Sequence, residues 1–198
     1  MKKFLFIIFF FISSNLYSEQ KLILVAGVNN SIITNIDILS EVALLKVLNN
    51  NTRIDDVVAK QVALENVINE ILKDTEIKAK NIKLANKELV DRQYNELLEK
   101  ITKNSQSIST DMKSKIYQKI RLDYEWKELI TQQYTWMISV NMNEINEKLD
   151  KMQKESTDTN KFIAIKEELI MTEKNKKLNI YSIIHMEKIK KKALIKFF

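Results

Sequence analysis

The chain has 198 residues, with no cysteine, no proline, one glycine, one histidine and a formal net charge of +6. These counts exclude disulfide bonds, a Cys–His catalytic pair, a histidine-rich metal site and a glycine-rich phosphate loop, so we expect no cofactor. Hydrophobic residues make up 45% of the chain and charged residues 29%, a balance that is typical of a folded domain.

Residues 1–18 have the pattern of a secretory signal peptide. Lys2 and Lys3 give a positive start, a nine-residue apolar run covers 4–12, and a polar stretch ends at Ser18. That run is shorter than the roughly 20 apolar residues needed to cross a bilayer. We therefore expect cleavage between Ser18 and Glu19 and export of the mature chain, with a retained N-terminal anchor as the alternative.

Two short β-rich runs, 22–28 and 31–34, flank Asn29 and Asn30. Asparagine tolerates the left-handed backbone of a tight turn, so this pattern predicts a β-hairpin. A two-stranded hairpin is only marginally stable by itself. The apolar chain end, residues 194–198, is a candidate third strand, and a frayed helix end is the alternative.

Elsewhere apolar residues recur at helical spacing. We expect a helix capped by Thr34 or Asn35, a second over 55–80, a third starting near Asn86, a long fourth over 111–140, a short fifth capped by Asn141 or Asn143, and a last over 161–192. Polar breaks are expected at 103–110 and 153–160. The expected apolar positions include Ile38, Val42, Leu45 and Leu48 in the first helix, Val58, Val62, Leu64, Ile68, Ile71 and Leu72 in the second, and Phe162, Ile165, Leu169, Ile180, Ile183 and Ile184 in the last.

The predicted fold class is thus mainly α, a multi-helix core with a small β-hairpin near its N-terminus that a C-terminal strand would complete. We expect a signal peptide over 1–18, the hairpin and helical core over 19–153, and a C-terminal helix and strand over 154–198 that pack back on the core.

Few residues suggest chemistry. His185 lies among apolar neighbours, and we interpret it as structural. Carboxylates alternate with lysines at helical spacing, which indicates solvated, salt-bridged faces. The basic run 188–196 is compatible with binding to nucleic acid or anionic lipid, but a solvated helix end is the simpler interpretation.

An aromatic cluster on the long fourth helix is the best candidate for function. Such side chains either fill a core or form a partly exposed groove that binds unfolded chains. On the second interpretation methionines help the surface adapt to varied clients. The candidate client-binding residues are Tyr117, Tyr124, Trp126, Tyr134, Trp136 and Met137.

The order of these parts resembles the SurA-type periplasmic chaperones. The opening LVAGVNNSIITNIDILSEV is similar to that family's strand, turn, strand and Asp-led first helix. KIRLDYEWKELITQQYTWMISVNMNEINEKLDKM resembles its long fourth helix and the short helix that follows, and IYSIIHMEKIKKKALIKFF its C-terminal helix and strand. The parvulin-type isomerase domains of the family have no counterpart here, because only residues 153–177 lie between those parts.

The resemblance implies an ATP-independent periplasmic holdase without isomerase activity. Such a protein binds unfolded outer-membrane proteins or peptides, and the outer-membrane assembly machinery is a further expected partner. We expect no nucleic-acid binding, no stable membrane insertion and no enzymatic activity. The alternatives are a non-catalytic helical adaptor that binds one envelope partner and a degenerate isomerase.

Overall fold

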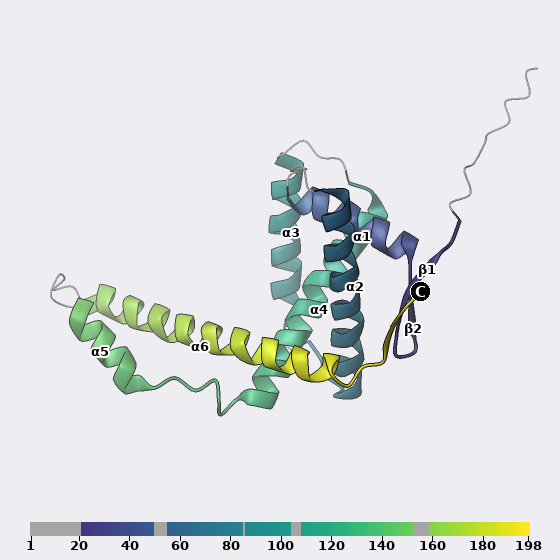
Figure 1. Cartoon of the computed structure of the whole chain (residues 1–198). Helices are drawn as coiled ribbons and strands as arrows, with labels where there is room; N and C mark the ends of the chain where they lie inside the picture. The colour runs from purple at the N-terminus through teal and green to yellow at the C-terminus, as the bar shows by residue number, and fades with distance from the viewer. Residues whose placement is uncertain (1–20, 50–54, 85, 104–107, 153–158) are drawn as a thin grey trace, which may run out of the picture.

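The computed structural model describes residues 21–49, 55–84, 86–103, 108–152 and 159–198 (Figure 1). The predicted signal peptide lies outside these residues, as do residues 104–107 and 153–158 of the two predicted polar breaks. Within them the protein is mainly helical with one small antiparallel sheet, which confirms the predicted fold class.

The predicted hairpin is present. Strands β1 (Leu24–Val28) and β2 (Ser31–Thr34) pair antiparallel, and Asn29 takes the left-handed conformation at the turn, with φ of 52°. Strand β3 (Ile195–Phe197) pairs antiparallel with β1, so the strand order is β2-β1-β3 and the predicted third strand is confirmed. Asn29 also joins the two chain segments, because its backbone N–H donates to the Leu194 carbonyl and its side-chain oxygen accepts from the Leu194 N–H.

The helices begin where short polar side chains cap them. Thr34 and Asp37 form a capping box at the first helix, Asp55 caps the second, and Ser109 caps the fourth. The predicted fourth helix was too long, since it ends at Tyr134 and a turn follows. The bounds are α1 Asn35–Leu48, α2 Asp56–Ala79, α3 Lys87–Lys103, α4 Thr110–Tyr134, α5 Met142–Met152 and α6 Thr159–Lys190.

The helices pack in pairs around three hydrophobic clusters. Helix α1 packs on α2, α3 on α4, and α2 on α4, while α6 crosses α2 and α4 before it leads to β3. Figure 1 shows that α6 extends away from these helices and that α5 runs alongside its outer part. The first cluster joins the sheet to α1 and α2 through Ala26, Val28, Ile33, Ile38, Val42, Ala59, Ala63, Ile68 and Leu72. The second joins α2, α4 and the turn after α4 through Ile77, Leu122, Trp126, Leu129, Ile130 and Ile138, and the third joins α1, α3 and α4 through Leu44, Val90, Ile101, Ile116 and Ile120.

Two predicted apolar faces were wrong in part, although Ile68 and Leu72 of α2 are buried as predicted. On α2 the buried side chains near the sheet are Ala59 and Ala63, while Val58 and Val62 are exposed. On α6 the isoleucines at 180, 183 and 184 are exposed. Helix α6 carries two apolar stripes, and the one that packs on the core consists of Leu178, Tyr181, His185, Met186 and Ile189. None of the described helices combines the length and hydropathy required to cross a membrane.

Candidate functional site

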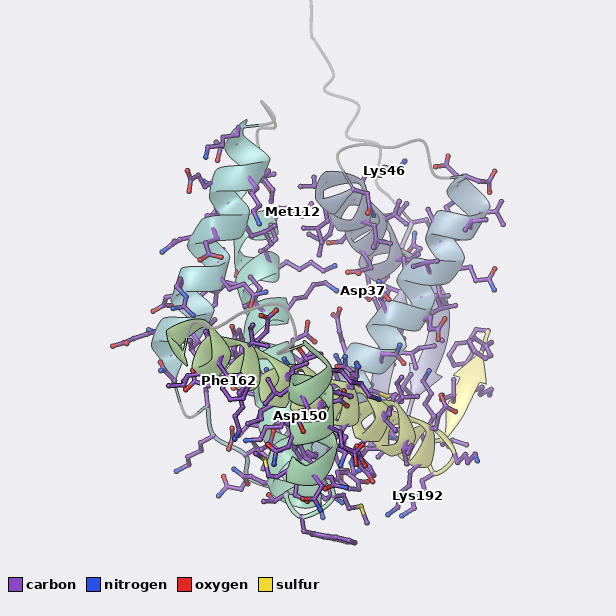
Figure 2. The ribbon with its side chains drawn as sticks, turned by 90° about the vertical axis from the view of Figure 1, so that its left-hand side faces the viewer. Asp37, Lys46, Met112, Asp150, Phe162 and Lys192 are labelled. Carbon is purple, nitrogen blue, oxygen red and sulfur yellow. The ribbon has the colours of Figure 1, made fainter. Side chains whose placement is uncertain are left out.

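A groove with a volume of about 530 Å³ lies where α1, α2, α4 and α6 meet. In Figure 2, Lys46 of α1 and Met112 of α4 lie on opposite sides of the gap above it, and α6 runs below. The groove is open to solvent and combines an apolar lining with charged side chains. Its lining residues are Glu41, Leu45, Leu48, Asn66, Asn69, Glu70, Lys73, Lys119, Leu122, Asp123, Trp126, Ser182, Ile183, Met186, Glu187 and Lys190.

The apolar part of the lining comes from α1, α4 and α6. Leu48 of α1 and Ile183 of α6 are 40% and 64% exposed, so both present hydrocarbon to a bound chain. Trp126 is buried, and its indole Nε1 donates a 2.8 Å hydrogen bond to Ser182 Oγ. Because this bond joins α4 to α6, Trp126 holds these two helices together beside the groove, and its buried ring does not fill the groove.

A buried carboxylate in the lining of the groove joins three of the helices that form it. Glu41 of α1 is 1% exposed, and its Oε1 lies 2.9 Å from Lys119 Nζ and 3.1 Å from Asn66 Nδ2. Its Oε2 lies 3.2 Å from Lys115 Nζ, and Lys119 also pairs with Glu70. The network therefore joins α1, α2 and α4 through charge-assisted contacts.

These contacts keep Glu41 ionised. Burial by itself raises the pKa of the Glu41 carboxyl, because a low-dielectric site disfavours charge. The hydrogen bond and positive charge of Lys119, helped by Asn66 and Lys115, outweigh burial and hold the pKa below the ordinary value of 4.5. A buried carboxylate paired in this way fixes the relative positions of three helices.

Further ion pairs line the rim. Lys73 Nζ lies 2.6 Å from Asp123 Oδ1 and 6.0 Å from the Trp126 ring centroid. Lys190 Nζ lies 3.4 Å from Glu65 Oε1. Positive and negative groups alternate, so the rim does not select ligands of one charge.

Behind the groove, His185 of α6 fills a buried position between α2 and α4. Its Nδ1 lies 3.0 Å from the Tyr134 hydroxyl, and its Nε2 lies 3.4 Å from Glu76 Oε1. The neutral ring with its proton on Nε2 fits this geometry, because Nδ1 then accepts from the Tyr134 hydroxyl, while the buried Nε2 lies near the Glu76 carboxylate without a hydrogen bond to it. Burial lowers the pKa of His185 below 6.5, although the charge of Glu76 acts in the opposite direction.

Tyr134 completes this contact between α4 and α6. Its ring stacks on Tyr181 with a centroid distance of 5.0 Å. Burial and the neighbouring charge of Glu76 raise the pKa of the Tyr134 hydroxyl, so it stays protonated. The arrangement is a packed, hydrogen-bonded cluster, and no nucleophile is activated in it.

The structure does not bring the six sequence-predicted client-binding residues together on one surface. Only Trp126 lines the groove. Tyr117 donates to Asp91 at 2.9 Å and packs edge-on against Tyr94 of α3, and Tyr124 lines a separate hollow beside α3. The remaining three lie near the C-terminal end of α4, with Tyr134 in the His185 cluster, Met137 half-buried and Trp136 72% exposed.

Sequence reasoning missed the centre of the site. The carboxylates were interpreted as solvated, and this was wrong for Glu41. One signal was available, because Glu41 lies between Ile38 and Val42 on the face of α1 that is predicted to be buried. A charge on such a face requires partners, and nothing in the sequence indicated Lys115 and Lys119.

The groove combines apolar side chains with paired charges. Among the described residues no cluster of carboxylate or histidine side chains is arranged to hold a metal ion. What the groove offers is exposed hydrocarbon beside paired charges, and such a surface can bury apolar side chains of a ligand. No family model matches this chain, and a search of the curated proteins finds no match.

Proposed function

We propose that this protein is an ATP-independent chaperone that holds unfolded outer-membrane proteins in the periplasm and assists their assembly. The observation that carries the proposal is the open groove, in which exposed Leu48 and Ile183 lie beside the buried apolar side chains of Leu122 and Trp126. Export to the periplasm rests on the signal-peptide pattern of residues 1–18, and the choice of client on the resemblance described above.

The groove suits weak binding to varied sequences. Leu48, Ile183 and half-buried Met186 offer hydrocarbon without a deep pocket of fixed shape. Burial of apolar surface is non-directional, so different client side chains can occupy the same place. Methionine adds a flexible, polarisable contact. Release then requires only a competing partner and no chemical energy.

The small sheet supplies a second mode of contact. Its outer strands, β2 and β3, flank β1, and each has one side that no described strand pairs with. An extended client segment can add to such an edge through backbone hydrogen bonds, which are independent of sequence. This mode complements side-chain burial in the groove.

Suppression of aggregation tests the proposal. The chain from Glu19 contains every described element, and it is mixed with a urea-unfolded outer-membrane barrel diluted into buffer while light scattering is followed. We expect suppression at a near-stoichiometric ratio, and loss of suppression for Leu48→Asn/Ile183→Asn. The matched control is Leu39→Asn/Ile180→Asn, which changes exposed residues of the same two helices outside the groove and should retain suppression.

Two results would contradict the proposal. If the wild-type protein leaves light scattering unchanged, the protein does not have the proposed chaperone activity. If both double variants lose suppression of aggregation equally, the groove is not the client-binding site. Saturable binding to one folded envelope protein without suppression would instead support the adaptor function.

A further inference from the structure

The last part of the basic C-terminal run, residues 191–196, lies beside the small sheet and does not line the groove. Lys191, Lys192 and Lys196 are exposed, and within the described part of the chain none of them has an ion-pair partner. Lys190, by contrast, faces Glu65 and Glu187. Three positive charges therefore remain uncompensated near the turn from α6 into β3.

Large apolar side chains surround these lysines. Leu194, Phe197 and Phe198 are 74%, 62% and 66% exposed, and Ile32 on β2 is 61% exposed. A solvated helix end would not require aromatic residues at this degree of exposure. The combination distinguishes this surface from a simple charged terminus.

The strand register brings the two kinds of side chain onto one face. Gly27 of β1 pairs with Ile32 on one side and with Lys196 on the other, so Ile32 and Lys196 point to the same face of the sheet. The Phe198 ring lies over Gly27, 3.8 Å from where a Cβ would stand, and Lys196 Nζ is 5.3 Å from its centroid. A basic-aromatic patch results, which we define as Ile32, Leu194, Lys191, Lys192, Lys196 and Phe198, while Phe197 pairs with Ala26 and points to the other face.

The beginning of the described chain adjoins the same patch. Phe198 N–H donates to the Val25 carbonyl at 3.0 Å, which places the last residue next to the start of β1. Leu22 and Ile23, which lead into that strand, are 61% and 52% exposed. Figure 1 shows both ends of the described chain near the small sheet.

We propose that the basic-aromatic patch docks on the surface of a membrane that contains anionic phospholipids. Lysines at an anionic bilayer gain electrostatic attraction, and aromatic or aliphatic side chains between them enter the headgroup region. Charge complementarity and this interleaving favour a lipid surface over an acidic protein, which would not require an exposed phenylalanine, leucine and isoleucine among the lysines. The contact is peripheral and leaves the groove between α1, α2, α4 and α6 free.

Flotation with lipid vesicles tests the proposal on the chain from Glu19, which retains all the described elements. The probes are vesicles of phosphatidylcholine alone and of phosphatidylcholine with 30% phosphatidylglycerol, a composition of about one anionic lipid in three. We expect binding to the anionic vesicles only, reduced by high salt because the attraction is screened. Lys191→Glu/Lys192→Glu/Lys196→Glu should lower this binding at least about tenfold, from about fivefold per lysine.

A matched variant separates the patch from overall charge. Lys87→Glu/Lys113→Glu/Lys174→Glu makes the same charge change at exposed lysines on α3, α4 and α6 away from the sheet, and it should retain binding. Trp136→Phe/Phe198→Trp places a fluorescent reporter in the patch, and we expect its emission to shift to the blue with anionic vesicles. Far-ultraviolet circular dichroism of each variant establishes that it is folded.

Three outcomes would overturn the proposal. These are absence of binding to anionic vesicles, equal loss of binding in both triple variants, and self-association of the wild-type chain that the patch variant abolishes, which would assign the patch to a second copy. The assay needs no client protein, so its result is independent of the aggregation experiment.

Discussion

Lys119 of α4 and Glu41 of α1 form an ion pair of 2.9 Å in which the carboxylate is almost completely buried. They are 78 residues apart in the sequence, and the pair joins helices on two sides of the groove. Because a buried charge without its partner is costly, this contact specifies how the helices are placed.

We predict that Glu41→Gln lowers the free energy of unfolding by about 1–3 kcal/mol, because Lys115 and Lys119 lose the charge they face. The control Glu99→Gln, which changes an exposed carboxylate paired with Lys103, should alter it by less than about 0.5 kcal/mol. Urea denaturation followed by circular dichroism measures both. Similar small effects in the two variants would contradict a structural role for the buried network.

The same carboxylate predicts acid sensitivity. The pKa of Glu41 is lower in the folded protein than its ordinary 4.5, so its stabilisation is present above that value and is lost as the pH falls through the folded-state pKa. Wild-type stability should therefore fall below about pH 4.5 more steeply than that of Glu41→Gln. Parallel curves for the two proteins in that range would show that Glu41 is not the group responsible.

The burial of His185 leads us to predict a second pH range in which the stability of the protein changes. The pKa of His185 is lowered by burial, so the folded protein favours the neutral ring and is destabilised as the pH falls from 6.5 through the folded-state pKa. The groups facing it are Glu76 and Lys80 of α2, Lys188 of α6 and the Tyr134 hydroxyl. As His185 is the only histidine, the variant His185→Gln should flatten the stability curve between about pH 6.5 and 5 and leave the steeper fall at lower pH. Thermal denaturation across this range measures the effect, and an unchanged slope in the variant would contradict it.

We predict that truncation of the two tryptophans changes the stability of the protein to very different extents. Trp126 is 4% exposed and hydrogen-bonded to Ser182, so Trp126→Ala should cost about 3–5 kcal/mol of stability. Trp136 is 72% exposed, so Trp136→Ala should change stability by less than about 0.5 kcal/mol. Denaturation followed by circular dichroism compares them. A comparable loss in both would mean that the turn after α4 is packed more tightly than its exposure indicates.

The contacts of Asn29 lead to a prediction about how strongly β3 is held in the sheet. The positive φ of Asn29 and the hydrogen bond that its Oδ1 accepts from the Leu194 N–H predict that Asn29→Ala costs about 1–2 kcal/mol, whereas the neighbouring Asn30→Ala should be close to neutral. Hydrogen exchange of the β3 amides measures the local effect. Unchanged protection of β3 in Asn29→Ala would show that strand pairing alone retains the C-terminal segment.

The sequence by itself determined the features that depend on near neighbours. The turn at Asn29 follows from the backbone preference of asparagine, and the helix starts at Thr34, Asp55 and Ser109 follow from side chains that cap amides two or three residues later. Helical spacing of apolar residues was sufficient to predict the mainly α fold. These signals are local, so they can be recognised without knowing which helices and strands pack together.

The tertiary structure alone decided which faces are used. Helix α6 has two apolar stripes, and only its packing on α2 and α4 buries the one with Tyr181 and His185 and leaves Ile183 exposed in the groove. The six candidate client-binding residues were separated for the same reason, because residues close in sequence on α4 and in the turn after it face different neighbours. Burial of Glu41 likewise depends on lysines from a helix far along the chain. Long-range contacts determine these outcomes because the free energy of an apolar or charged side chain depends on what finally covers it.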